Sequence, residues 1–356
     1  MISKRKRHDI SSEGLQENHL GWLAHKAIQK HFDKAIRYEA EVLRDTDPEP
    51  LHQMRVELRR LRTTLYTYGC AVRLPHDASE HYVKKLSKTL GRVRDLDVLI
   101  QRLEHEYRPL LHKKEKRILD RVIATQRKYR KKCFSTLTKA LNGKPYKHFK
   151  SAYRQWLNAP QYDRVADYSI HLVAPDLVLP LLSHVFLHAG WSVSQAFAQD
   201  TIEIDRLHHW LNDDGKILHD LRKQIKLLRY QLEFLSEIHT ETLQEPVQAF
   251  KHIQELLGQF QDDWVLNQVL KKAINTRWMQ KLPTVAKHLK NEQYRLWEAW
   301  HPVTIQFLSP TYRYELRYTI AGLTKPSPDA LARLRSSIST KQLGIEPYNT
   351  RADQGL

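Results

Sequence analysis

Two stretches of this chain, 167 positions apart, have closely similar sequences. Residues 51–62 read LHQMRVELRRLR and residues 218–229 read LHDLRKQIKLLR. Downstream, LGRVRDLDVL at 90–99 is echoed at the same offset by LGQFQDDWVL at 257–266. Self-similarity at a fixed offset indicates an internal duplication. We therefore expect two similar folding units, each with its own copy of the same surface.

Both copies carry apolar residues three and four positions apart, a spacing that places them on one face of an α-helix. These residues are Leu51, Met54, Leu58, Leu61, Leu65 and Tyr68 in the first copy, and Leu218, Leu221, Ile225, Leu228, Leu232 and Leu235 in the second. The pattern predicts two helices that bury this face in the core of a helical bundle.

One position after each of the first four apolar residues lies a cationic or imidazole side chain, and Tyr66 and Glu233 follow the fifth. The two rows are His52, Arg55, Arg59 and Arg62 in the first copy, and His219, Arg222, Lys226 and Arg229 in the second. Successive residues are about 100° apart on a helix, so each row borders the buried face instead of lying opposite it. Its aliphatic stems would be partly buried and its charged heads would face a groove.

The second element of each repeat contains a Lys, a Gly and an Asp on one helix face. These are Lys84, Gly91 and Asp95, then Lys251, Gly258 and Asp262. Glycine inside a helix costs about 1 kcal/mol relative to Ala, which predicts that another backbone, that of the basic helix, passes close by. The aspartates are then expected to orient Arg or His side chains.

The pattern H-x-x-R-x-x-x-[RK]-x-x-R followed by L-G-x-x-x-D, present twice, resembles the CHAD family of histidine-bearing α-helical domains. The resemblance runs from about Trp22 to about Leu323. It implies an all-α fold of two four-helix bundles, related by an internal duplication and a pseudo-twofold axis, with a basic central groove or pore. It also implies non-catalytic binding of inorganic polyphosphate.

The resemblance implies a set of ligand-binding residues, with Asp95 and Asp262 as orienting carboxylates. With flanking cations included, the binding set is His52, Arg55, Arg59, Arg60, Arg62, Lys84, Lys88, His219, Arg222, Lys223, Lys226, Arg229 and Lys251. Arg60 corresponds to Leu227, and the segment before the second basic helix lacks the basic residues often found there in relatives. We therefore expect the second half to hold the ligand less strongly than the first.

The composition agrees with this reading. The 356 residues include 58 Lys plus Arg against 40 Asp plus Glu, a formal charge of +18 that favours polyanionic partners. Only 11 glycines occur, as in helical proteins. The two cysteines, Cys70 and Cys133, form no C-x-x-C motif, so neither a disulfide framework nor a zinc site is expected.

The duplication predicts the domain boundaries. They are a basic flexible tail at 1–14, the first bundle at 15–158, a linker at 159–175, the second bundle at 176–323 and a loose tail at 324–356. No secretory signal is evident, and the most apolar stretch, residues 177–191, is shorter than the roughly 20 residues of a membrane helix. We expect a cytoplasmic protein that associates with polyphosphate granules and has no membrane partner.

Two other functions remain open at this stage. A nucleic-acid binder, specifically of RNA, fits the charge, but Tyr66 and Tyr230 alone offer little surface for base stacking. A phosphoanhydride hydrolase would need clustered carboxylates for metal ions, whereas each repeat contributes one matched Asp beside Arg. We expect no catalytic residue, cofactor or protein-bound metal. The expected partners are polyphosphate with accompanying divalent cations, and nucleic acid as a weaker competitor.

Overall fold

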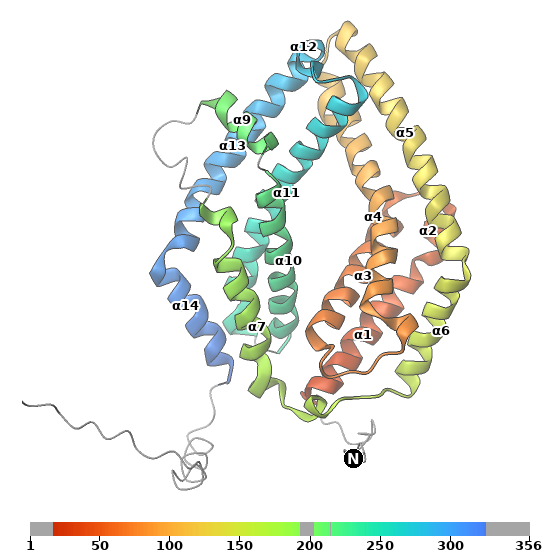
Figure 1. Cartoon of the computed structure of the whole chain (residues 1–356), viewed down its shortest axis with the longest axis vertical. Helices are drawn as coiled ribbons and strands as arrows, with labels where there is room; N and C mark the ends of the chain where they lie inside the picture. Colours follow the sequence, from red (N-terminus) through yellow and green to blue (C-terminus); the bar gives the residue numbers. More distant parts are fainter. Residues whose placement is uncertain (1–16, 193–202, 214, 239, 325–356) are drawn as a thin grey trace, which may run out of the picture.

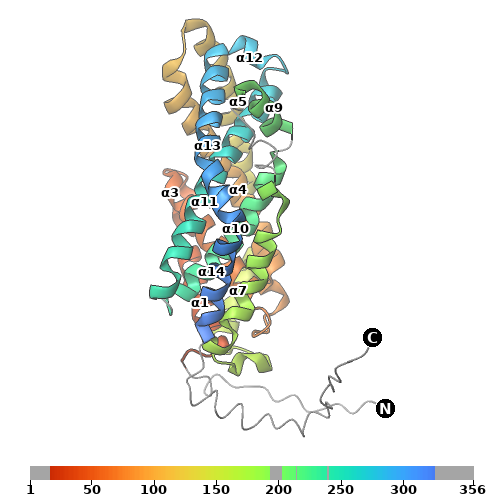
Figure 2. The ribbon, with the colours of Figure 1, turned by 90° about the vertical axis from the view of Figure 1, so that its left-hand side faces the viewer.

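The computed structural model describes residues 17–192, 203–213, 215–238 and 240–324. This part of the chain is helical, with two isolated β-bridges in place of any strand. Figures 1 and 2 show long helices that run roughly along the long axis of the molecule. The predicted tail at 1–14 lies outside the described residues, and so does the predicted tail at 324–356 apart from Thr324.

The first half forms a bundle in which α3 packs between α1 and α4, α4 packs on α5, and α6 returns along α5 toward α1. Its helices are α1 (Leu20–Arg37), α2 (Glu39–Arg44), α3 (Pro48–Tyr68), α4 (Glu80–Arg102), α5 (Lys113–Asn142) and α6 (Lys144–Asn158). The helix α4 continues as one π-helical turn, Leu103–Tyr107.

The second half repeats this packing order, because α10 lies between α7 and α11, α11 packs on α13, and α14 returns to α7. Its helices are α7 (Ile170–Phe186), α9 (Ile204–Asp213), α10 (Lys216–Ser236), α11 (Thr240–Ala273), α12 (Trp278–Lys281), α13 (Pro283–Leu308) and α14 (Pro310–Ala321). The two basic helices, α3 and α10, therefore hold equivalent places among their neighbours.

The basic helix α3 begins where local chemistry favours a helix start. The side chain of Asp47 accepts a hydrogen bond of 2.8 Å from the backbone N–H of Glu49, and Pro48 occupies the first helical position. Every apolar residue that was predicted to lie on the buried face of α3 or of α10 is buried. The helical period of the sequence thus decided which face of each basic helix enters the core.

The segment between the halves is shorter than predicted. We expected an irregular linker at 159–175, but α7 already begins at Ile170 and includes Pro175. Pro175 is itself buried in the apolar face that α7 packs into the core, and this burial outweighs the backbone hydrogen bond that a proline lacks. The remaining residues are tied to the first half, with the Arg73 guanidinium donating to Asp163 at 2.6 Å.

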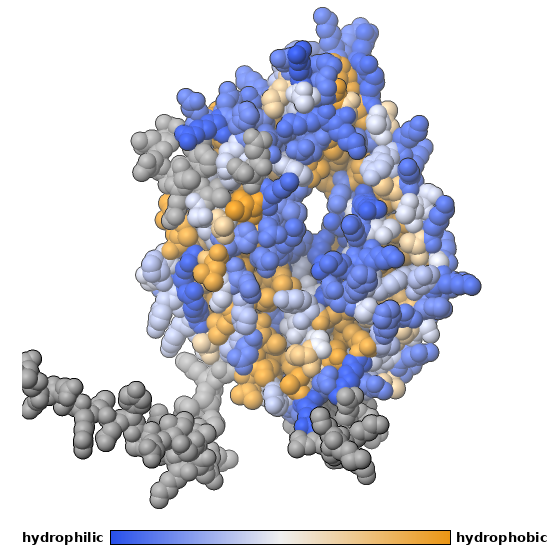
Figure 3. Space-filling model, viewed as in Figure 1, coloured by the Kyte–Doolittle hydropathy of each residue, from blue (hydrophilic) through white to orange (hydrophobic). Residues whose placement is uncertain are grey.

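The two halves meet at both ends of the molecule and separate between them. A continuous hydrophobic core extends through the lower part of both halves, and a second, smaller core joins α4 and α5 to α11, α12 and α13 at the other end. Between them Figure 3 shows an open hole surrounded by hydrophilic residues. No described helix combines the length and apolarity needed to cross a membrane.

Candidate functional site

The cationic rows of α3 and α10 face each other across the interface between the halves. The Arg59 guanidinium on α3 donates a hydrogen bond of 3.2 Å to the hydroxyl of Tyr230 on α10. Arg55 and Arg222 are close enough that the positive charge of Arg222 lowers the pKa of Arg55. The structure therefore brings the two sequence copies of the basic row into a single cluster.

Lys226 lies at the centre of this cluster. Burial and the positive charges of the neighbouring arginines together lower its pKa to about 6, with burial the larger cause. In order of effect these are Arg59, Arg222, Arg55 and Arg229, two from each helix. Burial, the largest cause, and these four cations thus favour the uncharged amine at neutral pH.

Each interior glycine makes room for an arginine of the basic helix. A Cβ atom on Gly91 would lie 3.4 Å from Nε of Arg55, and one on Gly258 would lie 3.3 Å from Nη2 of Arg222. We predicted a neighbouring backbone at these glycines, and that was wrong in detail. The neighbour is a guanidinium, a planar group that needs a flat surface with no side chain in its path.

The predicted orienting carboxylates differ between the halves. Asp95 forms an ion pair with Arg55, with 3.0 Å between Oδ1 and Nη2, and its side chain is largely exposed. Burial raises the pKa of the Asp262 carboxyl, and the positive charge of Arg222 acts in the opposite direction. Asp95 also raises the pKa of Arg222, which lies on the opposite half. Both aspartates therefore act on the arginine cluster, although Asp95 does so by direct contact.

His52 and His219 lie at the start of the two rows, and each has a buried Nδ1 atom without a hydrogen-bond partner. Burial lowers the pKa of His52, followed by the charge of Arg94. Burial also lowers the pKa of His219, followed by Lys223, while a hydrogen bond with Gln261 raises it. Both imidazoles are thus biased toward the neutral form.

The last members of the rows are compensated inside their own halves. Arg62 forms an ion pair with Glu80. Arg229 pairs with Glu233 and donates a 3.0 Å hydrogen bond to Gln254, and it is buried. Arg62 and Arg229 therefore each have a glutamate partner on their own half, as Arg55 has Asp95.

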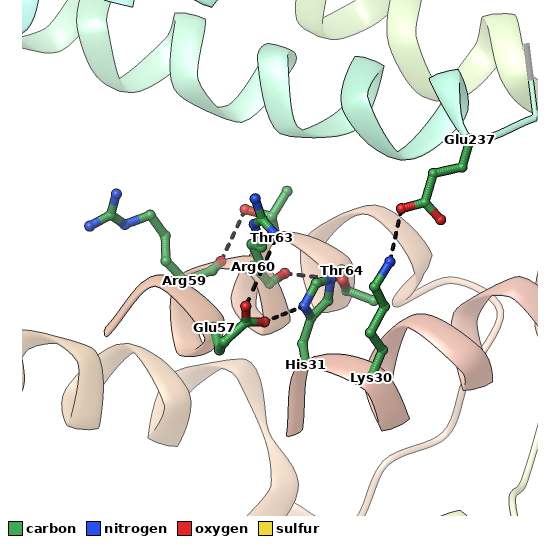
Figure 4. A network of polar contacts seen from close by, with 8 residues as sticks. All are labelled: Lys30, His31, Glu57, Arg59, Arg60, Thr63, Thr64 and Glu237. Atoms are coloured by element: carbon green, nitrogen blue, oxygen red, sulfur yellow. Dashed lines mark hydrogen bonds and ion pairs between the residues drawn. The ribbon is translucent and has the colours of Figure 1, made fainter. Parts of the chain in front are cut away.

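Arg60, the predicted residue without a counterpart, lies beside an acidic partner on its own helix. One of its guanidinium nitrogens lies 4.0 Å from Glu57, which accepts a 2.7 Å hydrogen bond from the buried His31. Figure 4 shows Arg60 beside this pair and Arg59 pointing away from it. Arg60 thus lies where α1, α3 and α10 meet, in a pocket that Lys30 and Tyr230 also line.

The remaining predicted cations are exposed lysines. Lys84, Lys88 and Lys251 are exposed, and Lys223 pairs with Asp220 at 3.3 Å. The other carboxylates considered for metal chemistry have arginine partners: Asp97 pairs with Arg130 at 2.8 Å and Asp263 with Arg102 at 2.5 Å. Within the described residues, no group of three or more metal-ligating side chains occurs.

Comparison with known proteins agrees with this architecture. The CHAD domain family matches residues 26–271, more than half of the chain. The chain belongs to the CHAD domain family. No curated protein matched the sequence.

Two solved structures share the CHAD fold with this chain. The CHAD domain from the plant Ricinus communis has a TM-score of 0.52 and 22% identity, over 86% of this chain and 94% of its own. PptA from Streptomyces chartreusis has a TM-score of 0.56 and 18% identity, over 81% of this chain and 99% of its own. At these identities the likeness shows the fold alone.

Sequence reasoning missed one cation of this CHAD domain's cluster. Arg94 on α4 acts on both His52 and Arg55. It lies one helical turn after Gly91 inside the repeated LGRVRDLDVL segment, so its position on the inner face of α4 was available from the spacing. Its counterpart is Gln261, and this lack of a repeated charge concealed it.

Proposed function

We propose that this protein binds inorganic polyphosphate, without transforming it, in the cationic cluster between α3 and α10. We further infer that its two bundles derive from one duplicated unit and supply the two walls of a single basic groove. The CHAD family is associated with polyphosphate-related proteins, which supports this ligand.

The juxtaposition of Arg55 and Arg59 with Arg222 and Lys226 carries the proposal. These side chains come from helices 167 positions apart in sequence, yet they depress one another's pKa values. Like charges gathered in a partly desolvated place cost free energy until a counter-charge arrives. A polyanion would lower that cost for both rows at once.

The chemistry of the cluster suits a chain of phosphates better than a nucleic acid. Arginine forks bind phosphate oxygens bidentately, and successive helical turns about 5.4 Å apart repeat these donors along an extended anion. Tyr230 is engaged by Arg59 and Arg229, and its ring is therefore committed to the cluster. We accordingly expect nucleic acid to bind as a weaker competitor.

Binding without catalysis is part of the same proposal. The carboxylates nearest the cluster, Asp95 and Asp262, lie beside Arg55 and Arg222, where they offset positive charge. A hydrolase that uses two metal ions would instead need carboxylates free to ligate them. We also propose that polyphosphate binding attaches the protein to polyphosphate granules, and that divalent cations on the polymer compete with its side chains.

Calorimetric titration with polyphosphates of defined length tests the proposal, with orthophosphate and single-stranded RNA as controls. We expect long polyphosphate to bind with one chain per protein and to displace RNA more readily than the reverse. The logarithm of the association constant should fall steeply with the logarithm of salt concentration, because each neutralised phosphate releases counterions. Equal affinity for RNA, or a flat salt dependence, would contradict the assignment.

A further inference from the structure

Packed side chains from both halves close the hole at the end of the molecule that lies uppermost in Figure 1. We call this contact the upper seam. Leu103 and Tyr107 from the first half and Leu270 and Trp278 from the second belong to one cluster of buried residues. Each of these four side chains is fully buried. Opening this seam would expose the whole cluster to water, so opening costs free energy and is rare in the folded protein.

Polar contacts reinforce the upper seam. The guanidinium of Arg102 donates to the buried Asp263 across the halves at 2.5 Å. Glu115 accepts two hydrogen bonds from Thr284, 3.1 Å from its backbone nitrogen and 2.8 Å from its hydroxyl. A buried charge that loses its partner is strongly penalised, so these contacts also resist separation of the halves.

The lower end is closed as well. The ring of Tyr68 on α3 packs edge-on against Phe234 on α10, with 5.0 Å between ring centroids. Lys30 pairs with Glu237 across the halves at 2.9 Å. The polypeptide itself also passes from α6 to α7 at this end of the molecule (Figure 1). The hole in Figure 3 is therefore bounded on every side by packed protein.

We propose that the two halves form a closed ring around the cationic cluster, and that a linear polyanion enters this ring by passing a free end through the hole. The inference rests on the proposed function, since it concerns how polyphosphate reaches that same site. Arg55, Arg59, Arg222 and Lys226 lie between the two seams, where side-chain heads from both halves act on one another. The ligand class is thus a linear polymer with at least one unobstructed end.

Threading makes both entry and exit of the polymer depend on its ends being free, whereas an open groove would not. A polymer with both ends blocked by bulky groups before mixing cannot enter a closed ring, even though its phosphates are unchanged. A polymer blocked after it has entered cannot leave, even when high salt weakens its ion pairs. In an open groove the chain would approach and depart sideways, and the timing of the blocking would make no difference.

The experiment uses the full chain and a long linear polyphosphate that carries biotin at both ends, with streptavidin as the blocking group. We expect streptavidin added first to slow association by about tenfold or more, because entry would then require a seam to open. Streptavidin added after loading should retain the polymer on the protein through size-exclusion chromatography in high salt. Polyphosphate with biotin at one end is the matched control and should bind and dissociate freely in both orders.

The outcomes distinguish this inference from the proposed function. If unblocked polyphosphate fails to bind, both are overturned. If unblocked polyphosphate binds, and the doubly blocked polymer associates as fast as the singly blocked control and is released by salt, the function stands and the closed ring does not.

Discussion

The basic helices α3 and α10 have similar sequences but differ in how much of their positive charge they keep at neutral pH. Both bury the same apolar face, and both set an arginine against an interior glycine. At the next position of the row α3 has Arg59 and α10 has Lys226, whose pKa falls to about 6. Arginine keeps its charge when partly buried, whereas lysine gives up its proton. Two helices with nearly the same sequence pattern can therefore differ in whether their charge is permanent or depends on pH.

The largest expected effect is the difference in polyphosphate affinity between a variant of α3 and the matching variant of α10. Replacing Arg55 and Arg59 by Ala should weaken polyphosphate binding about 100-fold at neutral pH, since each charge-assisted hydrogen bond contributes about 1.5 kcal/mol or more. Replacing Arg222 and Lys226 by Ala should weaken it about tenfold, because Lys226 is mostly uncharged before the ligand binds. Calorimetry measures both constants.

The matched control for this pair is Lys113→Ala with Lys114→Ala, two exposed cations on α5, which should leave affinity nearly unchanged. In both cluster variants the stoichiometry should stay at one chain per protein. Halved stoichiometry with unchanged affinity would show two independent sites. A larger loss from the α10 pair would reverse the comparison.

The second prediction concerns the pH at which the α10 wall becomes charged. The nearest charged groups around Lys226 are Arg59, Arg222, Arg55 and Arg229, which do not titrate in this range. Affinity should rise as pH falls through about 6, and binding near pH 7 should take up a proton. Lys226→Arg should strengthen binding about tenfold at pH 7.5 and remove most of this dependence. An unchanged pH profile in that variant would exclude Lys226 as the titrating group.

Protein stability provides an independent check on Lys226. Its pKa is lower in the folded state than the ordinary value of 10.5, so the unfolded state binds more protons between about pH 6 and that value. The free energy of unfolding should therefore gain a positive slope with pH across this window, and stability is lost as pH falls through it. Lys226→Met should reduce this slope in denaturant titrations, whereas Lys223→Met, at an exposed position, should not.

A smaller effect is expected at the two histidines. Burial lowers both pKa values, and the neighbouring charge is Arg94 for His52 but Lys223 for His219. A bound polyanion favours protonation, so the double variant His52→Gln with His219→Gln should lose a few-fold rise in affinity below about pH 6.5. Arg94→Gln should raise the pKa of His52, as followed by NMR. If His52 titrates at the same pH in that variant, Arg94 does not act on it.

The smallest effect should be the same in both halves. Gly91→Ala and Gly258→Ala each put a Cβ against a guanidinium at nearly the same distance, 3.4 Å and 3.3 Å. Each change should raise stability by up to about 1 kcal/mol through helix propensity, and should weaken polyphosphate binding about threefold by shifting the arginine. Thermal unfolding and calorimetry measure the two effects. A change at only one glycine would mean that the two pockets are not equivalent.

Much of the fold could be predicted from sequence, because helical periodicity is a local property. The residues of the apolar faces of α3 and α10 were predicted one by one, and all of them are buried. The resemblance to the CHAD family was confirmed by the family match. The start of α7 was missed because the burial of Pro175 depends on packing partners that local sequence does not specify.

The sequence by itself determined which residues form the two basic rows, since spacing on a helix fixes which side chains share a face. Only the tertiary structure decided which of those charges remain available. Glu80 pairs with Arg62, Glu57 lies beside Arg60 and Asp95 pairs with Arg55. Arg59 instead donates to Tyr230 and has the largest effect of any charge on Lys226. Electrostatic cost depends on distance and desolvation, and both are set by neighbours that are remote in the chain.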